Sequence, residues 1–346
     1  MTLDCAIPGM SGSDKSDIGV WIVVLNWKNG PDTLECLESI ISSNDPCVAG
    51  VVVCDNASGD GSDVLIRNWF SNSGFCFSEA KWSDGEFLSV GAGNCEATDS
   101  SIEFALVHTG ANLGFAGGNN VGIRYVQHSK AFDYLFLLNN DALLAPGAVS
   151  GMVGRFAEGE QTGMCGCTVI YHHTPSQVQA YGGASFAPWL GRAVHIGAHL
   201  PVSAPRDAAG VEARLDYILG AALMISRPCL EQIGLMEESY FLYFEEVDWA
   251  TRAARAGFSF GYAPDAVVYH KEGGTIGSSS KKGARSLLSE HYLVRSRLRF
   301  TQKFYPWHLP GVIVFTIVQG ARAVVGGDVS RFLVRMRAMF GLPFKA

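Results

Sequence analysis

Residues 18–26 read IGVWIVVLN, a short apolar run that ends in a polar residue. Runs of the same kind recur at 50–54 (GVVVC) and 134–138 (YLFLL). Such runs are typical of strands that are buried on both faces of a parallel sheet. Between the first two runs, residues 31–43 place apolar side chains at helical spacing. The chain therefore predicts strand–helix–strand units of an α/β fold.

The rest of the sequence divides into segments of different character. Residues 1–17 are expected to be a flexible leader, because they lack the apolar core of a signal peptide. Residues 18–283 form the predicted main domain, interrupted by a polar, Gly- and Ser-rich segment at 71–104 that we interpret as an insertion. Residues 284–346 are predicted to form a basic, amphipathic helical region at the C-terminus.

The charge of the chain is unevenly distributed. The formal net charge of all 346 residues is −7, but residues 281–346 contain 12 Lys or Arg and 2 Asp or Glu. A basic tail on an acidic body favours an anionic partner, either nucleic acid or anionic lipid, and a solvated basic helix is the structural alternative. The nine cysteines show no zinc-site or disulfide-framework spacing and are expected to be buried free thiols.

Polar residues follow the predicted strands at their carboxyl ends, where open α/β sheets bind ligands. Residues 139–141 (Asn-Asn-Asp) follow one strand, and the Asp141 carboxylate is a candidate ligand for Mg²⁺ or Mn²⁺, which prefer oxygen ligands and keep phosphate oxygens and waters. Asp55 and Asn56 follow another strand and are candidates to contact a base or a ribose. An Asn- and Asp-rich turn or a helix cap would explain the same residues structurally.

Residues 112–120 read NLGFAGGNN and are expected to form a flexible loop near phosphate groups. The glycines stand at 114, 117 and 118, so the GxGxxG spacing of dinucleotide-binding proteins is absent. The absence of this spacing counts against an NAD-dependent enzyme. A helix is predicted to follow at 121–128.

The most informative stretch, residues 241–249, reads FLYFEEVDW. Three carboxylates lie among four large aromatic side chains, where a charge is costly unless it is paired or used. On a helix, Glu245, Asp248 and Trp249 share one face. Glu246 points in another direction and is freer to act as a general base. An acidic first helical turn is the structural alternative.

His270 follows an extended segment, 258–269, and precedes a Gly- and Ser-rich loop, 273–283. An imidazole in this position is a candidate metal or phosphate ligand, although a lone His is more often a core or surface residue. Lys281 and Arg285 are candidates to cover a leaving diphosphate when the loop closes.

Seven motifs occur in order along the chain. They are VVLNWKNG at 23–30, CDNASGDGS at 54–62, NLGFAGGNN at 112–120, LLNNDALLAPGA at 137–148, GAALMISR at 220–227, FLYFEEVDWATRAARAGF at 241–258 and VVYHKEGGTIG at 267–277. Together they resemble family 2 glycosyltransferases, in particular bacterial rhamnosyltransferase-like members of cell-surface polysaccharide assembly. Each motif alone is weak, but the ordered set is specific and covers roughly residues 18–300.

The resemblance implies a GT-A fold, which is a Rossmann-like mixed sheet flanked by helices, here with a C-terminal helical extension. It also implies a nucleotide-sugar donor, a divalent metal (Mg²⁺ or Mn²⁺) held by Asp141 and His270, and a catalytic base in the pair Glu245 and Glu246, of which we prefer Glu246. The residues expected to bind the nucleotide sugar are Asn26, Asp55, Asn56, Asn112, Gly114, Asn119, Asn140 and Asp141. Those expected to contact the acceptor or the leaving group are Asp248, Trp249, Lys281 and Arg285.

Two departures from the family pattern bear on the chemistry. The usual DxD motif reads Asn-Asn-Asp at 139–141, so one carboxylate remains for the metal. The acid pair is Glu-Glu at 245–246, where many relatives have Glu-Asp or Asp-Asp, so the choice of base stays open.

The predicted function is the inverting transfer of a sugar, with rhamnose from dTDP-rhamnose favoured, to a hydroxyl of a glycan or lipid-linked glycan. Transfer from a UDP-hexose or UDP-N-acetylhexosamine is the alternative on the same fold. A nucleotidyltransferase would need a phosphate-binding loop that NWKNG at 26–30 does not resemble. A non-catalytic carbohydrate- or nucleotide-binding protein would leave the acidic aromatic stretch unexplained.

Residues 309–325 are apolar but include Gln319 and Arg322, so they are not predicted to span a membrane, which takes about 20 apolar residues. With the flanking arginines they are interpreted as an interfacial anchor on an anionic membrane, and a basic helix packed on the main domain is the alternative. The protein is accordingly expected to be cytoplasmic and peripheral on the inner face of the cytoplasmic membrane. No nucleic-acid partner is expected, and a homodimer is left open.

Overall fold

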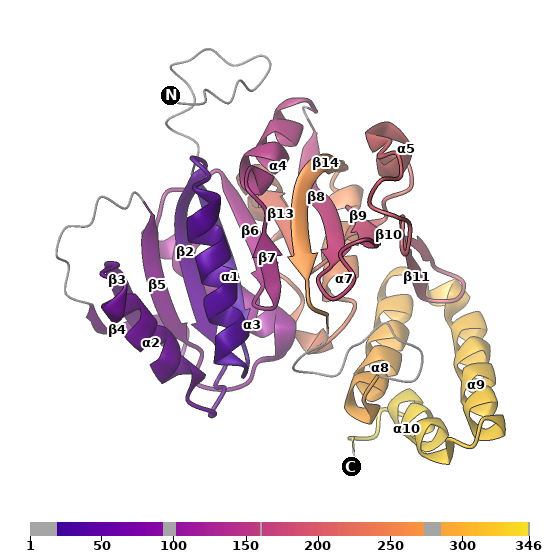
Figure 1. The fold of residues 1–346 in the computed structure, drawn as a ribbon. Helices are drawn as coiled ribbons and strands as arrows, with labels where there is room; N and C mark the ends of the chain where they lie inside the picture. Colours follow the sequence, from indigo (N-terminus) through magenta and orange to yellow (C-terminus); the bar gives the residue numbers. More distant parts are fainter. Residues whose placement is uncertain (1–18, 93–101, 160, 273–284, 345–346) are drawn as a thin grey trace.

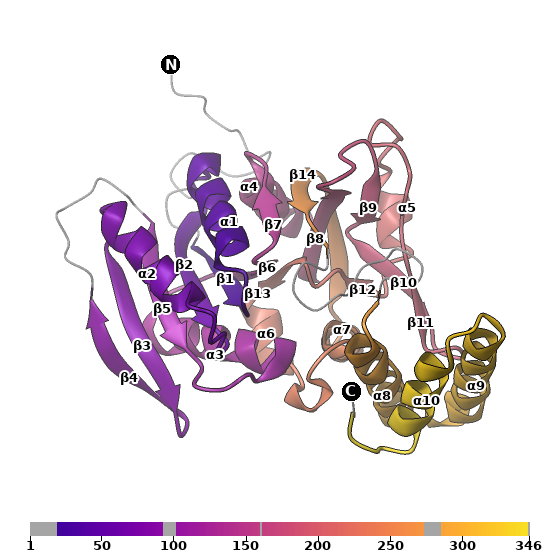
Figure 2. The same ribbon diagram turned by 60° about the horizontal axis from the view of Figure 1, so that its bottom comes forward.

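The computed structural model describes residues 19–92, 102–159, 161–272 and 285–344 (Figure 1). A central sheet with helices on both faces forms one body with a C-terminal layer of helices (Figures 1 and 2). The predicted leader at 1–17 lies outside the described residues, as do the loop at 273–283 and Lys281 within it.

The first half of the chain forms the parallel part of the central sheet. Its strands are β1 (Val20–Asn26), β2 (Val48–Asp55), β5 (Glu103–His108) and β6 (Tyr134–Asn139). β1 pairs in parallel with both β2 and β6, and β2 pairs in parallel with β5. All four carboxyl ends therefore lie along one edge of the sheet, the edge at which a ligand was predicted.

Helices cover both faces of this parallel part. They are α1 (Gly30–Ser43), α2 (Ser62–Asn72) and α3 (Gly114–Ser129). Ile22 and Val53 share a hydrophobic core with α1 and α2, whereas Val23 and Val52 share a second core with α3. Successive side chains of a strand point to opposite faces, so two buried faces require apolar residues at nearly every position.

α3 lies so close to the sheet that its inner face consists of glycines. A Cβ on Gly118 would lie 2.4 Å from Leu25 Cδ1, and one on Gly122 would lie 2.6 Å from Val23 Cγ1. The flexible loop predicted at 112–120 is thus wrong, because most of this stretch is helical. Its glycines serve close helix–strand contact rather than backbone freedom.

The second half of the chain adds strands of mixed direction. They are β7 (Ala142–Leu144), β8 (Thr162–Tyr171), β9 (Val178–Tyr181), β13 (Ala222–Ser226) and β14 (Ser259–His270). β13 is antiparallel to both β6 and β8, β14 is parallel to β8, and β7 is antiparallel to β14. A separate sheet contains β10 (Gly183–Ala187), β11 (Arg192–His195) and β12 (Tyr217–Ile218).

The remaining helices pack around this half and at the C-terminus. Those of the α/β part are α4 (Ala148–Ala157), α5 (Ala208–Glu212), α6 (Arg227–Ile233), the 3-10 helix η1 (Glu238–Tyr240) and α7 (Glu245–Arg255). The C-terminal ones are α8 (Leu287–Phe304), the 3-10 helix η2 (Pro306–His308), α9 (Leu309–Val325) and α10 (Val329–Met339). α8, α9 and α10 pack against one another on the side of the molecule that carries β11 (Figures 1 and 2).

Buried polar contacts join this C-terminal layer to the α/β part. The Ser296 hydroxyl of α8 donates to the Leu242 carbonyl at 2.9 Å, and Lys303 Nζ lies 2.7 Å from the buried Asp248 carboxylate. The region predicted to begin at residue 284 therefore packs directly against the segment that carries the acid pair.

The segment 71–104 contains more structure than its sequence pattern indicated. It includes β3 (Phe77–Ser83) and β4 (Glu86–Ala92), and β3 pairs in parallel with β5. The strand order of the central sheet is β4-β3-β5-β2-β1-β6-β13-β8-β14-β7, with β9 paired to β8. β4 is largely exposed, so no alternation of apolar and polar residues marks it in the sequence.

The expectation of free thiols holds for six of the seven described cysteines, those at positions 36, 47, 54, 165, 167 and 229, which are free and buried. Cys76 departs from it, because it is disulfide-bonded.

The packing of α3 predicts that Gly122→Ala destabilises the fold. The added methyl group would overlap Val23 and lie 2.8 Å from Cys54 Sγ, and overpacking of this kind costs about 1–3 kcal/mol. Urea unfolding followed by circular dichroism measures the change in the free energy of unfolding.

Gly154→Ala in α4 is the matched control, since nothing lies within 4 Å of a Cβ at that position. Its gain in helix propensity should stabilise the protein by about 0.5–1 kcal/mol. Equal losses of stability in the two variants would contradict the close packing of α3.

Candidate active site

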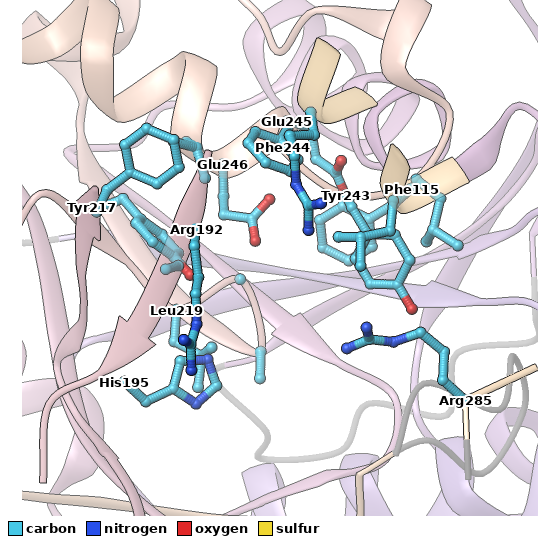
Figure 3. Close-up of a pocket in the computed structure, with 18 of the residues that line it drawn as sticks. Phe115, Arg192, His195, Tyr217, Leu219, Tyr243, Phe244, Glu245, Glu246 and Arg285 are labelled. Carbon is cyan, nitrogen blue, oxygen red and sulfur yellow. The ribbon is translucent and has the colours of Figure 1, made fainter. Parts of the chain in front are cut away.

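A cavity of about 480 Å³ lies at the carboxyl edge of the central sheet (Figure 3). Asn139 and His270, the last residues of β6 and β14, line it. The other walls come from the start of α7, from β11 and β12, and from the C-terminal helices. Cavities of this size hold small-molecule substrates or cofactors.

A left-handed turn sets the start of α7. Phe241, Tyr243 and Phe244 have φ values of 62°, 65° and 73°, a region that bulky side chains rarely adopt. Phe115 N donates to Phe241 O at 2.8 Å and holds the turn from outside. Gly114 permits this contact, because a Cβ there would lie 2.3 Å from Phe241 O. Gly114 was predicted to bind the nucleotide sugar. In the structure its lack of a side chain instead allows the Phe241 carbonyl to approach the start of α3.

Glu245 and Glu246 are the first residues of α7, and both line the cavity (Figure 3). Each carboxylate has a buried oxygen without a hydrogen-bond partner among the described residues. Burial raises the pKa of Glu246 to about 7. Burial also raises the pKa of Glu245 well above its usual value, and repulsion from Glu246 adds to this. A carboxylate with an open oxygen and a pKa near neutrality is suited to proton transfer.

Asp248 and Trp249 were predicted to contact the acceptor or the leaving group, and their positions correct this. Asp248 is fully buried and pairs with Arg252 Nε and Lys303 Nζ, each at 2.7 Å. Trp249 is also fully buried, and its Nε1 donates to a backbone carbonyl at 2.8 Å. Neither side chain lines the cavity, so both hold α7 in place.

Asn26 and Asp55 occupy the adjacent ends of β1 and β2 and are buried. Asn26 Nδ2 donates to Asp55 Oδ1 at 2.8 Å, and the Ser58 hydroxyl donates to the same oxygen at 2.5 Å. Asp55 Oδ2 accepts from Ser58 N at 3.3 Å, which leaves this oxygen capacity for a further donor. Contact between Asp55 and a base stays a prediction.

Asn56 braces the start of α3. Its Oδ1 accepts from Leu113 N at 3.0 Å, and its Nδ2 donates to Asn112 Oδ1 at 3.2 Å. Asn119 lies within α3, where its Nδ2 donates to Phe115 O at 3.0 Å. The predicted sugar-nucleotide contacts of Asn56 and Asn119 do not fit these buried, bonded positions. Asn112 is exposed, and its role stays a prediction.

His270 connects the end of β14 to Asp141. His270 Nε2 lies 3.1 Å from Asp141 Oδ1, and His270 Nδ1 lies 2.9 Å from Gln179 Oε1. Burial would lower the pKa of His270, but attraction to Asp141 outweighs it and raises the pKa. Burial would raise the pKa of Asp141, but attraction to His270 outweighs that effect and lowers it. Asn140 Nδ2 donates to Thr33 Oγ1 at 3.0 Å, and its contact with a donor stays a prediction.

The predicted strand-end and helix-end residues meet on one side of the molecule. The register pairs Asn26 with Asp55 and Leu25 with Asn139, so β2, β1 and β6 end together. Asn139 in turn lines the same cavity as Glu246. Asp55 and Asp141 lie at this edge without lining the cavity.

Several cavity residues were not predicted from the sequence. They are Gln179, Arg192, His195, Tyr217, Glu272, Glu290, Arg297 and Arg335. All but Glu272, which belongs to the motif at 267–277, lie outside the recognised motifs. The excess of arginine in the tail was the one sequence signal for Arg297 and Arg335. Arg285 was predicted and does line the cavity (Figure 3).

Comparison with protein families gives a match over much of this region. A family model described as "Glycosyltransferase like family 2" matches residues 98–288, more than half of the chain. The chain belongs to this glycosyltransferase family. The resemblance inferred from the ordered motifs is thereby confirmed.

Two curated relatives of this family member are similar in sequence. A low-salt glycan biosynthesis hexosyltransferase from Haloferax volcanii is 25% identical over 256 residues, covering 72% of this chain and 66% of the relative. An N-acetylglucosaminyl-diphospho-decaprenol L-rhamnosyltransferase from Mycobacterium tuberculosis is 25% identical over 189 residues, covering 50% and 60%. The matched region thus spans less than two thirds of either relative.

Solved structures bear out the predicted GT-A fold of this family member. A mannosyltransferase from Pyrobaculum calidifontis in complex with GDP-Man and Mn²⁺ superposes with a TM-score of 0.51 at 16% identity, covering 93% of this chain and 80% of that one. GalNAc-T7 with UDP, GalNAc and Mn²⁺ superposes with a TM-score of 0.55 at 14% identity, covering 93% and 54%. At these identities the likeness concerns the fold.

Proposed function

We propose that this family member transfers a sugar from a nucleoside diphosphate to a hydroxyl acceptor, with inversion at the anomeric carbon. The observation that supports this most directly is the cavity itself. Its walls bring the buried acids Glu245 and Glu246 together with the strand-end residues Asn139 and His270. One cavity thus combines a proton acceptor with a candidate metal ligand.

Glu246 is the proposed base. The acceptor oxygen forms a bond to the anomeric carbon while the bond from that carbon to the diphosphate oxygen breaks, and the hydroxyl proton moves to the Glu246 carboxylate. Burial and repulsion hold the pKa of Glu245 well above its usual value, which favours the protonated form of that residue. The pKa of Glu246, about 7, leaves a large ionised fraction at neutral pH, so Glu246 is preferred.

Asp141 and His270 fit a divalent cation. Without a metal, a proton on His270 Nε2 accounts for the 3.1 Å contact with Asp141 Oδ1 and for the raised pKa of His270. A divalent cation that binds both atoms would displace this proton, while Gln179 accepts from His270 Nδ1 and orients the ring. Among the described residues no group of three or more His, Cys, Asp or Glu could hold a metal, so diphosphate oxygens and waters would complete the shell. Mg²⁺ or Mn²⁺ bound here would neutralise charge on the departing diphosphate.

The remaining predicted contacts support the same assignment. Arg285 lines the cavity and is proposed to neutralise the leaving diphosphate, together with Lys281 from outside the described residues. Asp55, Asn112 and Asn140 are proposed to bind the nucleotide. Asn26, fully buried and hydrogen-bonded to Asp55 and Thr33, is proposed to hold the Asp55 carboxylate in place.

For the donor we propose rhamnose from dTDP-rhamnose, with a UDP-hexose or UDP-N-acetylhexosamine as the alternative. One curated relative is a rhamnosyltransferase and another is a hexosyltransferase, and both identities are low. The proposed acceptor is a hydroxyl of a glycan or lipid-linked glycan in surface polysaccharide assembly.

We further propose that the C-terminal region holds the protein at the cytoplasmic face of an anionic membrane. By length and composition one helical segment, Pro306–Val325, could cross a membrane, with a mean hydropathy of 1.4 and 17% of it buried. Gln319 of this helix lines the cavity, which supports a helix lying along the protein surface. Val314 and Trp307 are exposed and suited to the interface of a bilayer.

Replacement of the proposed base tests the reaction. Glu246→Gln should lower turnover by about 10²-fold or more, since it cannot accept the hydroxyl proton. Wild-type turnover should rise as the pH increases to about 7, because Glu246 must lose its proton. Mass spectrometry of nucleoside diphosphate release, with dTDP-rhamnose and UDP-hexoses as donors, measures both effects.

Glu231→Gln is the control for this substitution, because its side chain is 56% exposed on α6. Near-normal transfer by a folded Glu246→Gln enzyme would assign the role to Glu245. Release of pyrophosphate instead of nucleoside diphosphate would indicate nucleotidyl transfer.

The metal proposal predicts that Asp141→Asn abolishes the effect of Mn²⁺ on nucleoside diphosphate binding. Calorimetry with Mn²⁺, Mg²⁺ or EDTA measures this without turnover. Asp265→Asn, an exposed position on β14, is the control and should behave as wild type. Mn²⁺-stimulated binding that survives in Asp141→Asn would remove Asp141 from the metal site.

The membrane proposal predicts that the protein sediments with anionic vesicles at low salt. Val314→Asp on α9 should weaken this, because the side chain is 59% exposed and apolar. Val90→Asp on β4, 58% exposed, should leave sedimentation unchanged. If the wild type stays in the supernatant, the anchor is refuted.

A further inference from the structure

We propose that the cavity contains a second anion site, built by arginines of β11 and the C-terminal helices, that binds the phosphate or diphosphate of a lipid-linked acceptor. This inference rests on the proposed glycosyl transfer and names the class of its acceptor. The site differs from the proposed donor site at Asp141 and His270, which belongs to the edge of the central sheet.

Arg297 is the centre of this site. It lies on α8, is 5% exposed and lines the cavity. Its Nε and Nη1 have no hydrogen-bond partner among the described residues. Burial lowers the pKa of Arg297 to about 10, so the side chain remains charged at neutral pH. A buried cation without a partner is costly, and a bound anion would relieve that cost.

The surrounding fold leaves room for the Arg297 side chain. Gly191, in the turn between β10 and β11, has a φ of +57°, and a Cβ there would lie 2.7 Å from Arg297 Cγ. On another side, the Phe315 ring of α9 lies 5.5 Å from the guanidinium carbon. The side chain is thus confined between two elements distant in sequence, as expected of a positioned binding group.

Other arginines extend the site. Arg335 Nη1 is buried and lacks a hydrogen-bond partner among the described residues, whereas Arg285 belongs to the proposed donor site. The Glu290 carboxylate attracts Arg297 and opposes the effect of burial by raising its pKa, but this carboxylate is shared with Arg335 Nε at 2.7 Å and Arg331 Nη1 at 3.4 Å, so this one acid does not neutralise the group. In the described part of the chain, no acid lies within ion-pair distance of Arg297.

The chemistry of these groups favours a phosphate ligand. Several guanidinium N–H donors that converge on one cavity match the oxygens of a phosphate or diphosphate. Arg192 lies on the side of the cavity opposite Arg285 (Figure 3), and its charge is close enough to Arg297 to add to burial in lowering the pKa of that guanidinium.

The position of the site favours the acceptor, rather than the sugar donor, as the ligand of the arginines. Gln319 of α9 lines the same cavity, and the outer side of α9 exposes Val314, Ile317 and Val318. α9 thus forms part of the cavity wall with one face and exposes an apolar surface with the other. A molecule with a sugar at the acids, a phosphate at the arginines and an apolar chain along α9 would contact all three parts.

Calorimetry on the full chain tests this with farnesyl diphosphate, a short prenyl diphosphate, after the donor site has been saturated with nucleoside diphosphate and Mn²⁺. We expect the wild type to bind the probe. Arg297→Gln should weaken binding by about tenfold or more, the scale of hydrogen bonds to a charged group, and leave nucleoside diphosphate binding unchanged. Arg295→Gln, the loss of an exposed arginine on the same helix, should alter neither.

Three outcomes would overturn the inference. Competition between farnesyl diphosphate and nucleoside diphosphate would assign the arginines to the donor. If inorganic pyrophosphate binds as tightly as farnesyl diphosphate, the prenyl chain is not part of what the site recognises. If Arg297→Gln binds farnesyl diphosphate as tightly as the wild type, Arg297 does not contact the ligand. If Arg297→Gln does not fold, Arg335→Gln, whose side chain is 12% exposed, replaces it. Failure of the wild type to bind nucleoside diphosphate would instead contradict the proposed function.

Discussion

The backbone hydrogen bond from Phe115 N to Phe241 O is the constraint on which the site depends. It joins the start of α3 to the turn that precedes α7. α3 is itself fixed on β1 by glycines that leave no space for a side chain. The position of Glu245 and Glu246 is therefore set by the sheet, through one helix and one turn.

The turn carries a conformational cost that its surroundings must offset. Left-handed backbone at three aromatic residues costs on the order of 1–3 kcal/mol at each position. Phe244 packs against Phe300 of α8 with ring centroids 5.4 Å apart, and Lys303 of α8 pairs with Asp248 of α7. The C-terminal helices thus help to hold the acid pair, besides forming a wall of the cavity.

Unpaired charges of both signs line this cavity, and their distribution follows the fold. The acids stand at the first turn of α7, where burial raises the pKa of Glu246 to about 7. Arg297 approaches from α8. Folded proteins rarely leave such groups without partners. Their presence on opposed elements is what a substrate with a reacting hydroxyl and an anionic group would require.

The sequence by itself determined the parallel strands, the ligand-binding edge and the family. Strands buried on both faces need continuous apolar runs, and polar residues at their ends mark the ligand-binding edge. The strands at 18–26, 50–54 and 134–138 could therefore be predicted from the sequence alone. Tertiary structure decided which polar residues face the cavity. Asp248 and Glu246 are two positions apart, yet Lys303 reaches only one of them, and Arg297 became a site residue because Gly191 and Phe315 confine it. A pattern along the chain records the face of a helix but not the distant element that packs against it, and that element determines whether a charge is paired or open to a ligand.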